Sequence, residues 1–455
     1  MKKVLLAICA VALMSAPAFA SVQNIKVSGD IDSTYLLRNN FDFKSDSMDG
    51  TNTQNLFFTQ TRLRVDADLT DNVGATVALI NERIWDTESS DSNVDLNLAY
   101  VTLREMLYSP LTVIAGRQNF AYGNSFIVDS AGTNRTVTAG GLNSVAEDLS
   151  KRTAQDAIRL VFDYNPLTLD VLFSQIAENG GATTSGTNDR NDVYLYGTNA
   201  NYKFSDDWQT VGEAYFWVKQ NNNAQAGSNN TSGTGKADII MLPGFRVSTN
   251  PVKGLNVQGE FAWQFGNKTD PNGDNVAENK NHNAFATQLI ANYMLPFEAT
   301  AQWNPVVTGV FTHLSGDKTP AGADDDKAWD PFFENQGTGT IFSALFNLSN
   351  ANIYQLSGQV NPIQDVTAKV TWTDIWLDEK IPSLSITGPD NTSYSPAINT
   401  GKKELGNEVS VELAYDYTED VQFGLITGWF FPGDVFTSAN DVTASQVLLN
   451  GNVSF

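Results

Sequence analysis

Charged side chains stand at every second position of several apolar segments, and these are the residues best suited to contact a solute. In "QTRLRVDADLT", Arg62 and Arg64 alternate with Leu63 and Val65. Arginine binds carboxylates through paired hydrogen bonds, so such positions suit anionic or polyhydroxylated solutes. Alternation predicts a set of twelve charged residues on one side of the strands, lining a pore, although the segments around Arg83 and Arg117 break strict alternation. The set is Arg62, Arg64, Arg83, Arg104, Arg117, Arg159, Asp163, Asp170, Glu213, Glu260, Lys369 and Glu412.

Catalytic chemistry is only weakly indicated. His282 and His313 are the only histidines, and His313 with Ser315 is the nearest candidate for a hydrolytic pair. This pair falls where a strand is expected to meet a loop, and no orienting acid is apparent. Because a nucleophile needs a base held within hydrogen-bond reach, the sequence predicts no enzyme.

The acidic segments do not match a metal-binding motif. In the segment that begins "DPNGDNVAENK" at Asp270, glycine occupies the fourth position and Asn281 the twelfth. An EF-hand calcium loop requires glycine at the sixth position and glutamate at the twelfth. We interpret "ADDDK", which contains Asp324 to Asp326, as a solvated acidic loop in preference to a weak calcium site. The sequence therefore predicts no metal and no cofactor.

Period-two segments are the elements that must position the charged residues. "LNVQGEFAWQ" and "EVSVELAYDY" alternate apolar with polar residues, and similar segments recur along the chain without a helical period. This period predicts strands with one apolar and one polar face. Strands joined alternately by short turns and long polar loops are typical of outer-membrane β-barrels. The long connections are predicted at residues 39–54, 86–93, 121–155, 178–191, 220–236, 266–283, 316–338, 378–405 and 432–444.

We predict an all-β fold, a transmembrane antiparallel barrel of eighteen strands. Sixteen strands remain an alternative, because the segments at 237–249 and 338–360 are the weakest. A secreted β-sandwich or propeller is the competing fold, but it would not require alternating loop lengths. The apolar faces then meet lipid and the charged faces meet the lumen. Two readings of that lumen remain open: a charge-lined solute path, with a basic wall opposite acidic positions, or ion pairs that merely pack the interior.

The two ends of the chain predict export and barrel closure. Residues 1–20 carry Lys2 and Lys3, an apolar run and an A-x-A site, which together indicate a signal peptide before a single barrel domain, residues 21–455. "SQVLLNGNVSF" is predicted to close the barrel against the first strand, because every backbone group in hydrocarbon must be paired. An even strand number places both termini in the periplasm. Phe455 resembles the signal that barrel-insertion machinery recognises.

Composition agrees with this location. Aromatic residues make up 11% of the chain and charged residues 17%, less than the roughly 25% of soluble domains. The formal net charge of −23 excludes nucleic acid as a partner. The predicted location is the outer membrane of a Gram-negative-type bacterium, in contact with its lipid.

Three segments resemble the alginate export family of outer-membrane porins. They are "HLSGDKTPAGADDDKAWDPFFEN" (313–335), "GRQNFAYGN" (116–124) and the hairpin "LGNEVSVELAYDYTEDVQFGLITGWFFPGDVF" (405–436). The resemblance implies an eighteen-stranded channel, and the best-known member passes the anionic polysaccharide alginate outward through a strongly basic pore. Here the basic and acidic lumen positions are nearly balanced, which departs from that pattern.

The combined prediction is a passive channel for anionic or sugar-like small molecules or a polysaccharide. A general or substrate-selective porin for the uptake of small solutes is the first alternative. A barrel that binds a receptor or adheres through its loops is the second.

Overall fold

The computed structural model describes residues 23–44, 53–86, 94–132, 142, 145–177, 192–222, 237–269, 279–296, 302–319 and 325–455. The predicted signal peptide lies outside these residues. The main sheet contains β1 (Asn24–Asn39), β2 (Thr53–Thr70), β3 (Val73–Ile84), β4 (Val94–Leu103), β5 (Leu111–Gln118), β6 (Gln155–Asp163), β7 (Leu167–Ala177), β8 (Val193–Lys203), β9 (Val211–Asn221), β10 (Asp238–Val252), β11 (Leu255–Thr269), β12 (Asn279–Met294), β13 (Val306–Leu314), β14 (Ala351–Ile363), β15 (Val366–Leu377), β18 (Glu404–Asp416), β19 (Val421–Pro432) and β20 (Ala444–Ser454).

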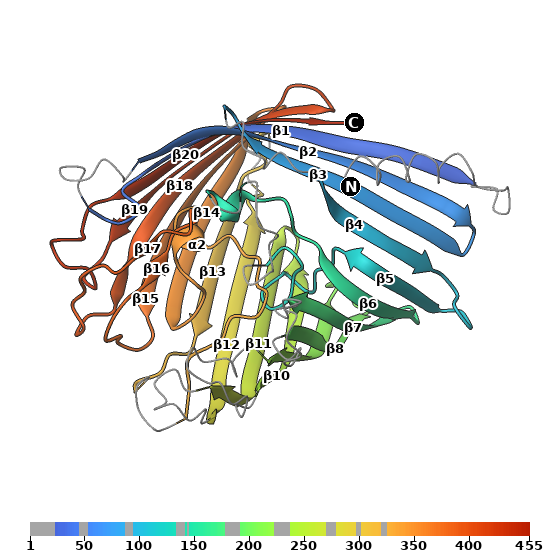
Figure 1. Cartoon of the computed structure of the whole chain (residues 1–455), viewed down its shortest axis with the longest axis horizontal. Coiled ribbons are helices and arrows are strands. Elements are labelled where there is room, and N and C mark those ends of the chain that lie inside the picture. Colours follow the sequence, from blue (N-terminus) through green and yellow to red (C-terminus); the bar gives the residue numbers. More distant parts are fainter. Residues whose placement is uncertain are drawn as a thin grey trace, which may run out of the picture.

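These eighteen strands form one closed antiparallel barrel, which confirms the predicted fold and the higher strand count. Each strand pairs with its neighbours in the chain, and β20 pairs with β1 from Asp30↔Ser454 to Asn39↔Ser445. Figure 1 shows this closure, where the first and last strands lie side by side. This pairing gives the backbone N–H and C=O groups of the first and last strands hydrogen-bond partners, as a barrel in hydrocarbon requires. Outside the barrel wall, β16 (Ile386–Thr387) and β17 (Ser393–Tyr394) form a small hairpin in one loop.

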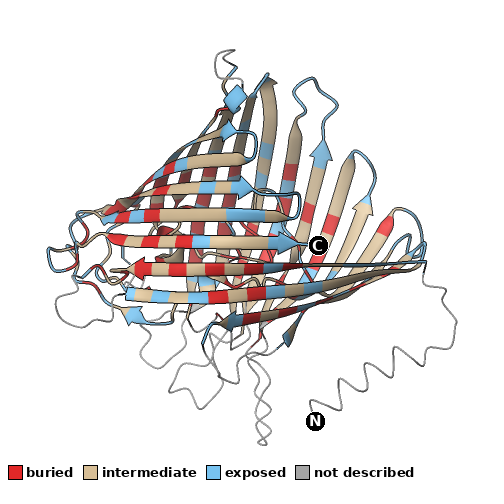
Figure 2. Ribbon diagram, turned by 90° about the horizontal axis from the view of Figure 1, so that it is seen from above, coloured by how far each residue is buried: buried red, intermediate tan, exposed pale blue. Residues whose placement is uncertain are grey.

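Burial alternates along the strands, as a wall with two different faces requires. On β12, His282, Ala284 and Ala286 are buried, whereas Phe285 and Leu289 are 42% and 55% exposed. Figure 2 shows this banding along many strands. The exposed aliphatic and aromatic side chains form the outer face, and the buried positions point inward. None of the helices in the described part of the chain is long and apolar enough to cross a membrane.

Long and short connections alternate between the strands. The short ones, such as residues 71–72, 164–166, 253–254 and 364–365, define the turn end of the barrel, and the long ones define its loop end. Two predicted boundaries were wrong. Both ends of the predicted loop at 266–283 are strand, because β11 and β12 pair as far as Thr269↔Asn279, and residues 270–278 lie outside the described residues. The predicted weak strand at 338–360 begins only at Ala351, and the residues before it include α2 (Phe342–Leu345).

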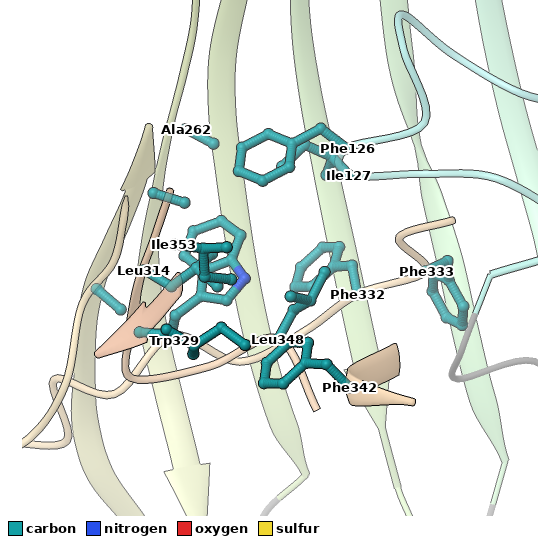
Figure 3. Packing of buried hydrophobic residues seen from close by; sticks show 14 of the residues in the cluster. Phe126, Ile127, Ala262, Leu314, Trp329, Phe332, Phe333, Phe342, Leu348 and Ile353 are labelled. Atoms are coloured by element: carbon teal, nitrogen blue, oxygen red, sulfur yellow. The ribbon is translucent and has the colours of Figure 1, made fainter. Parts of the chain in front are cut away.

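Two of the long connections fold against the inner wall. Residues 119–132 follow β5 and residues 325–350 precede β14, and together we call them the plug. Their backbones bond to each other at Phe333 N–H to Ile127 O (3.0 Å) and Asp129 N–H to Phe333 O (2.9 Å). Figure 3 shows Phe126, Trp329 and Phe332 within one apolar cluster beside the strands.

The wall beneath the plug carries apolar inward residues. Trp217, Leu242, Ala262 and Leu314 are at most 1% exposed and belong to the same cluster as the plug phenylalanines. A side chain that faces a packed loop is removed from water, so burial of apolar surface stabilises the contact. The simple pattern of polar inside and apolar outside therefore fails near the loop end.

Candidate functional site

The first wall of the lumen is formed by β1–β4 and holds the predicted arginines Arg62 and Arg64. Arg62 binds Asp30 at 2.8 Å, and Arg64 binds Asp66 at 2.7 Å. Lys151, from the loop after β5, reaches Asp30 and Asp32 at 3.2 and 2.8 Å. Leu63 points outward and is 42% exposed, so both arginines lie on the inner face.

Arg159 on β6 faces the plug. Its guanidinium forms an ion pair with Asp170 of β7 and lies 5.7 Å from the ring centre of Tyr122. Asp170 is buried, with 6% exposure, whereas Asp163 lies at the turn end of β6 and is exposed. Two predicted residues are thus brought together, and the third is separated from them.

A buried cluster on β9–β11 contains two more predicted carboxylates. Arg246 Nη1 lies 3.4 Å from Glu213 Oε1, and Arg246 Nε lies 4.0 Å from Glu260 Oε2. Tyr215 donates a hydrogen bond of 2.7 Å to Glu260. Arg246 was not among the predicted residues. It lies two residues beyond Gly244 on β10, and this alternation would have placed it on the inward face.

A cavity of about 350 Å³ lies against β14, β15 and β18–β20 and extends to β1 and β2, so it adjoins the first wall. Lys369 of β15 and Glu412 of β18 form an ion pair of 3.1 Å that lines it. Its other polar lining residues include Asp32, Gln60, Gln359, Gln422 and Asn450, and its apolar ones include Phe58, Leu149 and Leu448. The cavity therefore combines charged groups, planar amides and apolar surface.

The remaining predicted arginines are placed differently. Arg104 lies beyond the turn end of β4 and is 3.9 Å from Asp68. Arg83 and Arg117 were predicted to face the lumen, and the structure places both on the outer face instead. Arg83 follows Val77 and Leu79 on the exposed side of β3, while Glu82 points inward and is completely buried. Arg117 pairs with Asp156, whose strand neighbour Ile158 is 50% exposed.

The predicted separation of a basic wall from acidic positions is also not seen. The basic members of the predicted set that face inward each lie beside a carboxylate: Arg62 beside Asp30, Arg64 beside Asp66, Arg159 beside Asp170 and Lys369 beside Glu412. Arg104, at the turn end, likewise lies near Asp68. The charges of these residues are therefore local pairs. Arg62, Arg159 and Lys369 pair with carboxylates on neighbouring strands, whereas Arg64 pairs within its own strand.

A second charged cluster, which was not predicted from the sequence, fixes the plug to the wall. Asp330 of the plug binds Lys219 of β9 and lies 2.9 Å from Lys268 of β11. Burial raises the pKa of the Asp330 carboxyl, but the two ammonium groups outweigh this and hold its pKa far below the usual value. The signal available in sequence was "DDDKAWDPFF", where acidic and aromatic residues are mixed.

His282 belongs to this cluster. Its Nδ1 lies 3.0 Å from Asp326 Oδ2 and its Nε2 lies 3.0 Å from Gln264 Oε1. Gln264 also bonds both backbone groups of Asp330, at 2.9 and 2.6 Å, so its oxygen must face the histidine and Nε2 donates. Asp326 is thus an anchor of the plug, which corrects its interpretation as a solvated loop residue. Asp324 lies outside the described residues.

Glu408 of β18 anchors the other part of the plug. Its carboxylate accepts backbone N–H bonds from Thr340, Ile341 and Phe342, at 2.5 to 3.2 Å. In the part of the chain that the structure describes, no group of three or more acidic, histidine or cysteine side chains is arranged to hold a metal.

The closed barrel, its apolar outer face and its charged interior define an outer-membrane β-barrel of the porin type. A family model described as alginate export matches residues 30–450, so the chain belongs to the alginate export family. This membership places it in the outer membrane of Gram-negative bacteria, as a channel protein in contact with membrane lipid. No curated protein matches the chain significantly in sequence.

Solved structures support the fold. Pseudomonas aeruginosa OccK2 (OpdF) in complex with glucuronate is 11% identical, covers 95% of this chain and 99% of its own, and has a TM-score of 0.56. OprD from the same organism is 12% identical, with coverage of 97% and 95% and a TM-score of 0.56. A BenF-like porin from Pseudomonas fluorescens Pf-5 is 11% identical, with coverage of 95% and 100% and a TM-score of 0.56.

Proposed function

We propose that this channel passes polyhydroxylated or anionic solutes by passive diffusion along the side of the lumen that holds the 350 Å³ cavity. The observation that carries the proposal is the composition of this cavity, which lies beside the inner wall away from the apolar plug cluster. Charged residues that line a passage set its selectivity. The predicted residues Lys369 and Glu412 are the pair placed to do so, and no catalytic residue or cofactor is part of the proposal.

The cavity lining suits a sugar ring. Planar amides such as Gln359 and Asn450 donate and accept hydrogen bonds, which matches the hydroxyl groups of a sugar. Leu149 and Ile426, which also line the cavity and are only partly buried, offer apolar surface to the carbon–hydrogen face of the ring. Pockets that bind small molecules commonly combine apolar walls with a few directed polar groups.

The pairing of charges favours sugars and sugar acids over strongly anionic chains. Each positive group beside the cavity has a carboxylate partner, so a polyanion such as alginate would also meet Asp32 and Glu412. The OccK2 structure, which shares the fold, contains the sugar acid glucuronate. Uptake of such small solutes, the porin alternative, is therefore favoured over export of a long polyanion. No observation on the described loops favours receptor binding.

Planar-bilayer recordings test the proposal. We expect glucuronate and neutral oligosaccharides to interrupt the ion current of the purified channel at millimolar concentration. In the double variant Lys369→Gln with Glu412→Gln, the interruptions should become shorter. Both charged groups that bind the solute are lost, while the side chains keep a similar volume. The matched control is the exposed pair Lys402→Gln with Asp434→Asn, which joins loop residues at 2.9 Å. Equal interruption of the current in all three channels would reject the solute path.

A further inference from the structure

Arg83, on the outer face of β3, is a cation for which the described residues supply no ion pair. Arg83 is exposed and lies on the same side as Val77 and Leu79, which are 45% and 39% exposed. Within the described residues, no carboxylate lies within ion-pair distance of its guanidinium. The other outward arginine, Arg117, is instead paired with Asp156 at 3.3 Å. A lipid-facing arginine without a partner is unfavourable unless an anion from outside the chain reaches it.

Neighbouring aromatic residues indicate the depth of Arg83 in the membrane. The rings of Tyr35 and Phe57 are 4.6 Å apart, and those of Phe57 and Trp85 are 5.0 Å apart. Trp85 also donates a hydrogen bond of 2.9 Å to Thr59, the residue opposite Arg83 on β2. Rows of exposed aromatic residues mark the interface between the hydrocarbon and the head groups in barrels. Arg83 therefore lies beside lipid head groups, at the loop end of the apolar band.

A groove surrounds this arginine. It has a volume of about 360 Å³ and is lined by Thr59, Asn81, Arg83, Trp85 and Asp86. The guanidinium provides several donors in a plane, which suits a phosphate group. Asp86 would repel a bare phosphate, but its carboxylate and the amide of Asn81 suit the hydroxyl groups of a sugar. The lining thus combines one site for a phosphate with neighbouring sites for hydroxyl groups.

We propose that this groove binds the sugar phosphate of a phosphorylated glycolipid, of the lipid A type, from the leaflet at the loop end. The location in a Gram-negative outer membrane supplies such a lipid where the long loops face outward, as the loop lengths predict. Arg83 holds the phosphate, Asn81 and Asp86 contact the sugar, and the acyl chains lie along Val77 and Leu79. The site is on the opposite side of the wall from the cavity, so it is independent of the proposed transport function.

Native mass spectrometry of the delipidated full-length barrel tests this site. The protein is titrated with lipid A, with dephosphorylated lipid A, with phosphatidylglycerol and with inorganic phosphate. We compare the wild type with Arg83→Gln and with the matched control Arg117→Gln, after a gel shift on heating has shown that each variant is folded. We expect one lipid A bound with an affinity that Arg83→Gln lowers about tenfold, the effect of losing a charge-assisted bond. Arg117→Gln should bind as the wild type does.

Four results would overturn the proposal. Equal affinity of the wild type and Arg83→Gln would remove Arg83 from the site. Equal retention of dephosphorylated lipid A would show that the phosphate is not recognised. Displacement of lipid A by millimolar inorganic phosphate, or tighter Arg83-dependent binding of phosphatidylglycerol, would show that a glycolipid is not the ligand.

Discussion

The two sides of the lumen use the same kinds of charged residue for different purposes. On the plug side, Lys219 and Asp330 each keep only 15% of their side-chain surface exposed. On the cavity side, Lys369 and Glu412 keep 36% and 39%. A pair that is removed from water fixes the loop that covers it, whereas a pair that remains wet is available to a solute. Residue type alone therefore does not distinguish an anchor from a candidate selectivity residue.

The difference follows from what surrounds each pair. Lys219 Nζ lies 5.0 Å from the ring centre of Phe332, inside the apolar cluster of the plug. Removal of one partner from such a pair leaves an uncompensated charge in a dry environment, which is strongly destabilising. The same change beside the cavity leaves a charge that water can solvate, and its effect on stability should be small.

The largest expected effect comes from release of the plug. Asp330→Asn leaves Lys219 and Lys268 without their shared anion, and the docked plug should lose about 3 kcal/mol or more of stabilisation. We expect single-channel conductance and its noise to rise, because the plug no longer occupies part of the lumen. The control is Asp325→Asn in the same segment, since the bond that the described residues form with Asp325 is an exposed one of 3.2 Å to Asn281. Unchanged conductance in a folded Asp330→Asn channel would contradict the anchoring role.

A smaller effect is expected on ion selectivity. The triple change of Arg62, Arg64 and Arg159 to Glu reverses three inward charges beside existing carboxylates, so reversal potentials should shift toward cation selectivity. The outward arginines provide the control, and Arg83→Gln with Arg117→Gln should leave the reversal potential unchanged. If the triple variant inserts and conducts with the selectivity of the wild type, these arginines do not line the ion path.

The smallest effect concerns pH. The pKa of Asp330 is lowered in the docked plug. The ionised carboxylate therefore stabilises the docked plug fully when the pH is above the ordinary aspartate pKa of 3.8, and this stabilisation is lost as the pH falls further. The difference in conductance between the wild type and Asp330→Asn should therefore be constant above pH ~5 and shrink only in stronger acid. Recordings at stepwise lower pH measure it. A difference that disappears near neutral pH would assign the anchoring to another group.

The inward and outward faces were predictable where alternation was regular. Arg62 and Arg64 follow the pattern set by Leu63 and Val65, and the structure places both inside. Arg83 was assigned to the lumen because it is charged, although strict alternation with Val77 and Leu79 places it on the outer face. Ile80 and Ile84 obscured that pattern because they are apolar and face inward, and Ile84 packs with the cluster of Leu142 and Phe58. On β5, Gly116 has a φ of +122°, so alternation around Arg117 is irregular.

By itself the sequence determined an antiparallel barrel of sixteen or eighteen strands, the alternation of loop lengths and the closing strand, because period two and turn residues are local properties that a barrel must satisfy. Only the tertiary structure decided that residues 119–132 and 325–350 pack into the lumen, that Asp330 meets Lys219 and Lys268, and that one side keeps a cavity. These features join residues more than fifty positions apart through burial and charge pairing. Their free energy depends on contacts that exist only once the barrel has closed, so no local pattern encodes them.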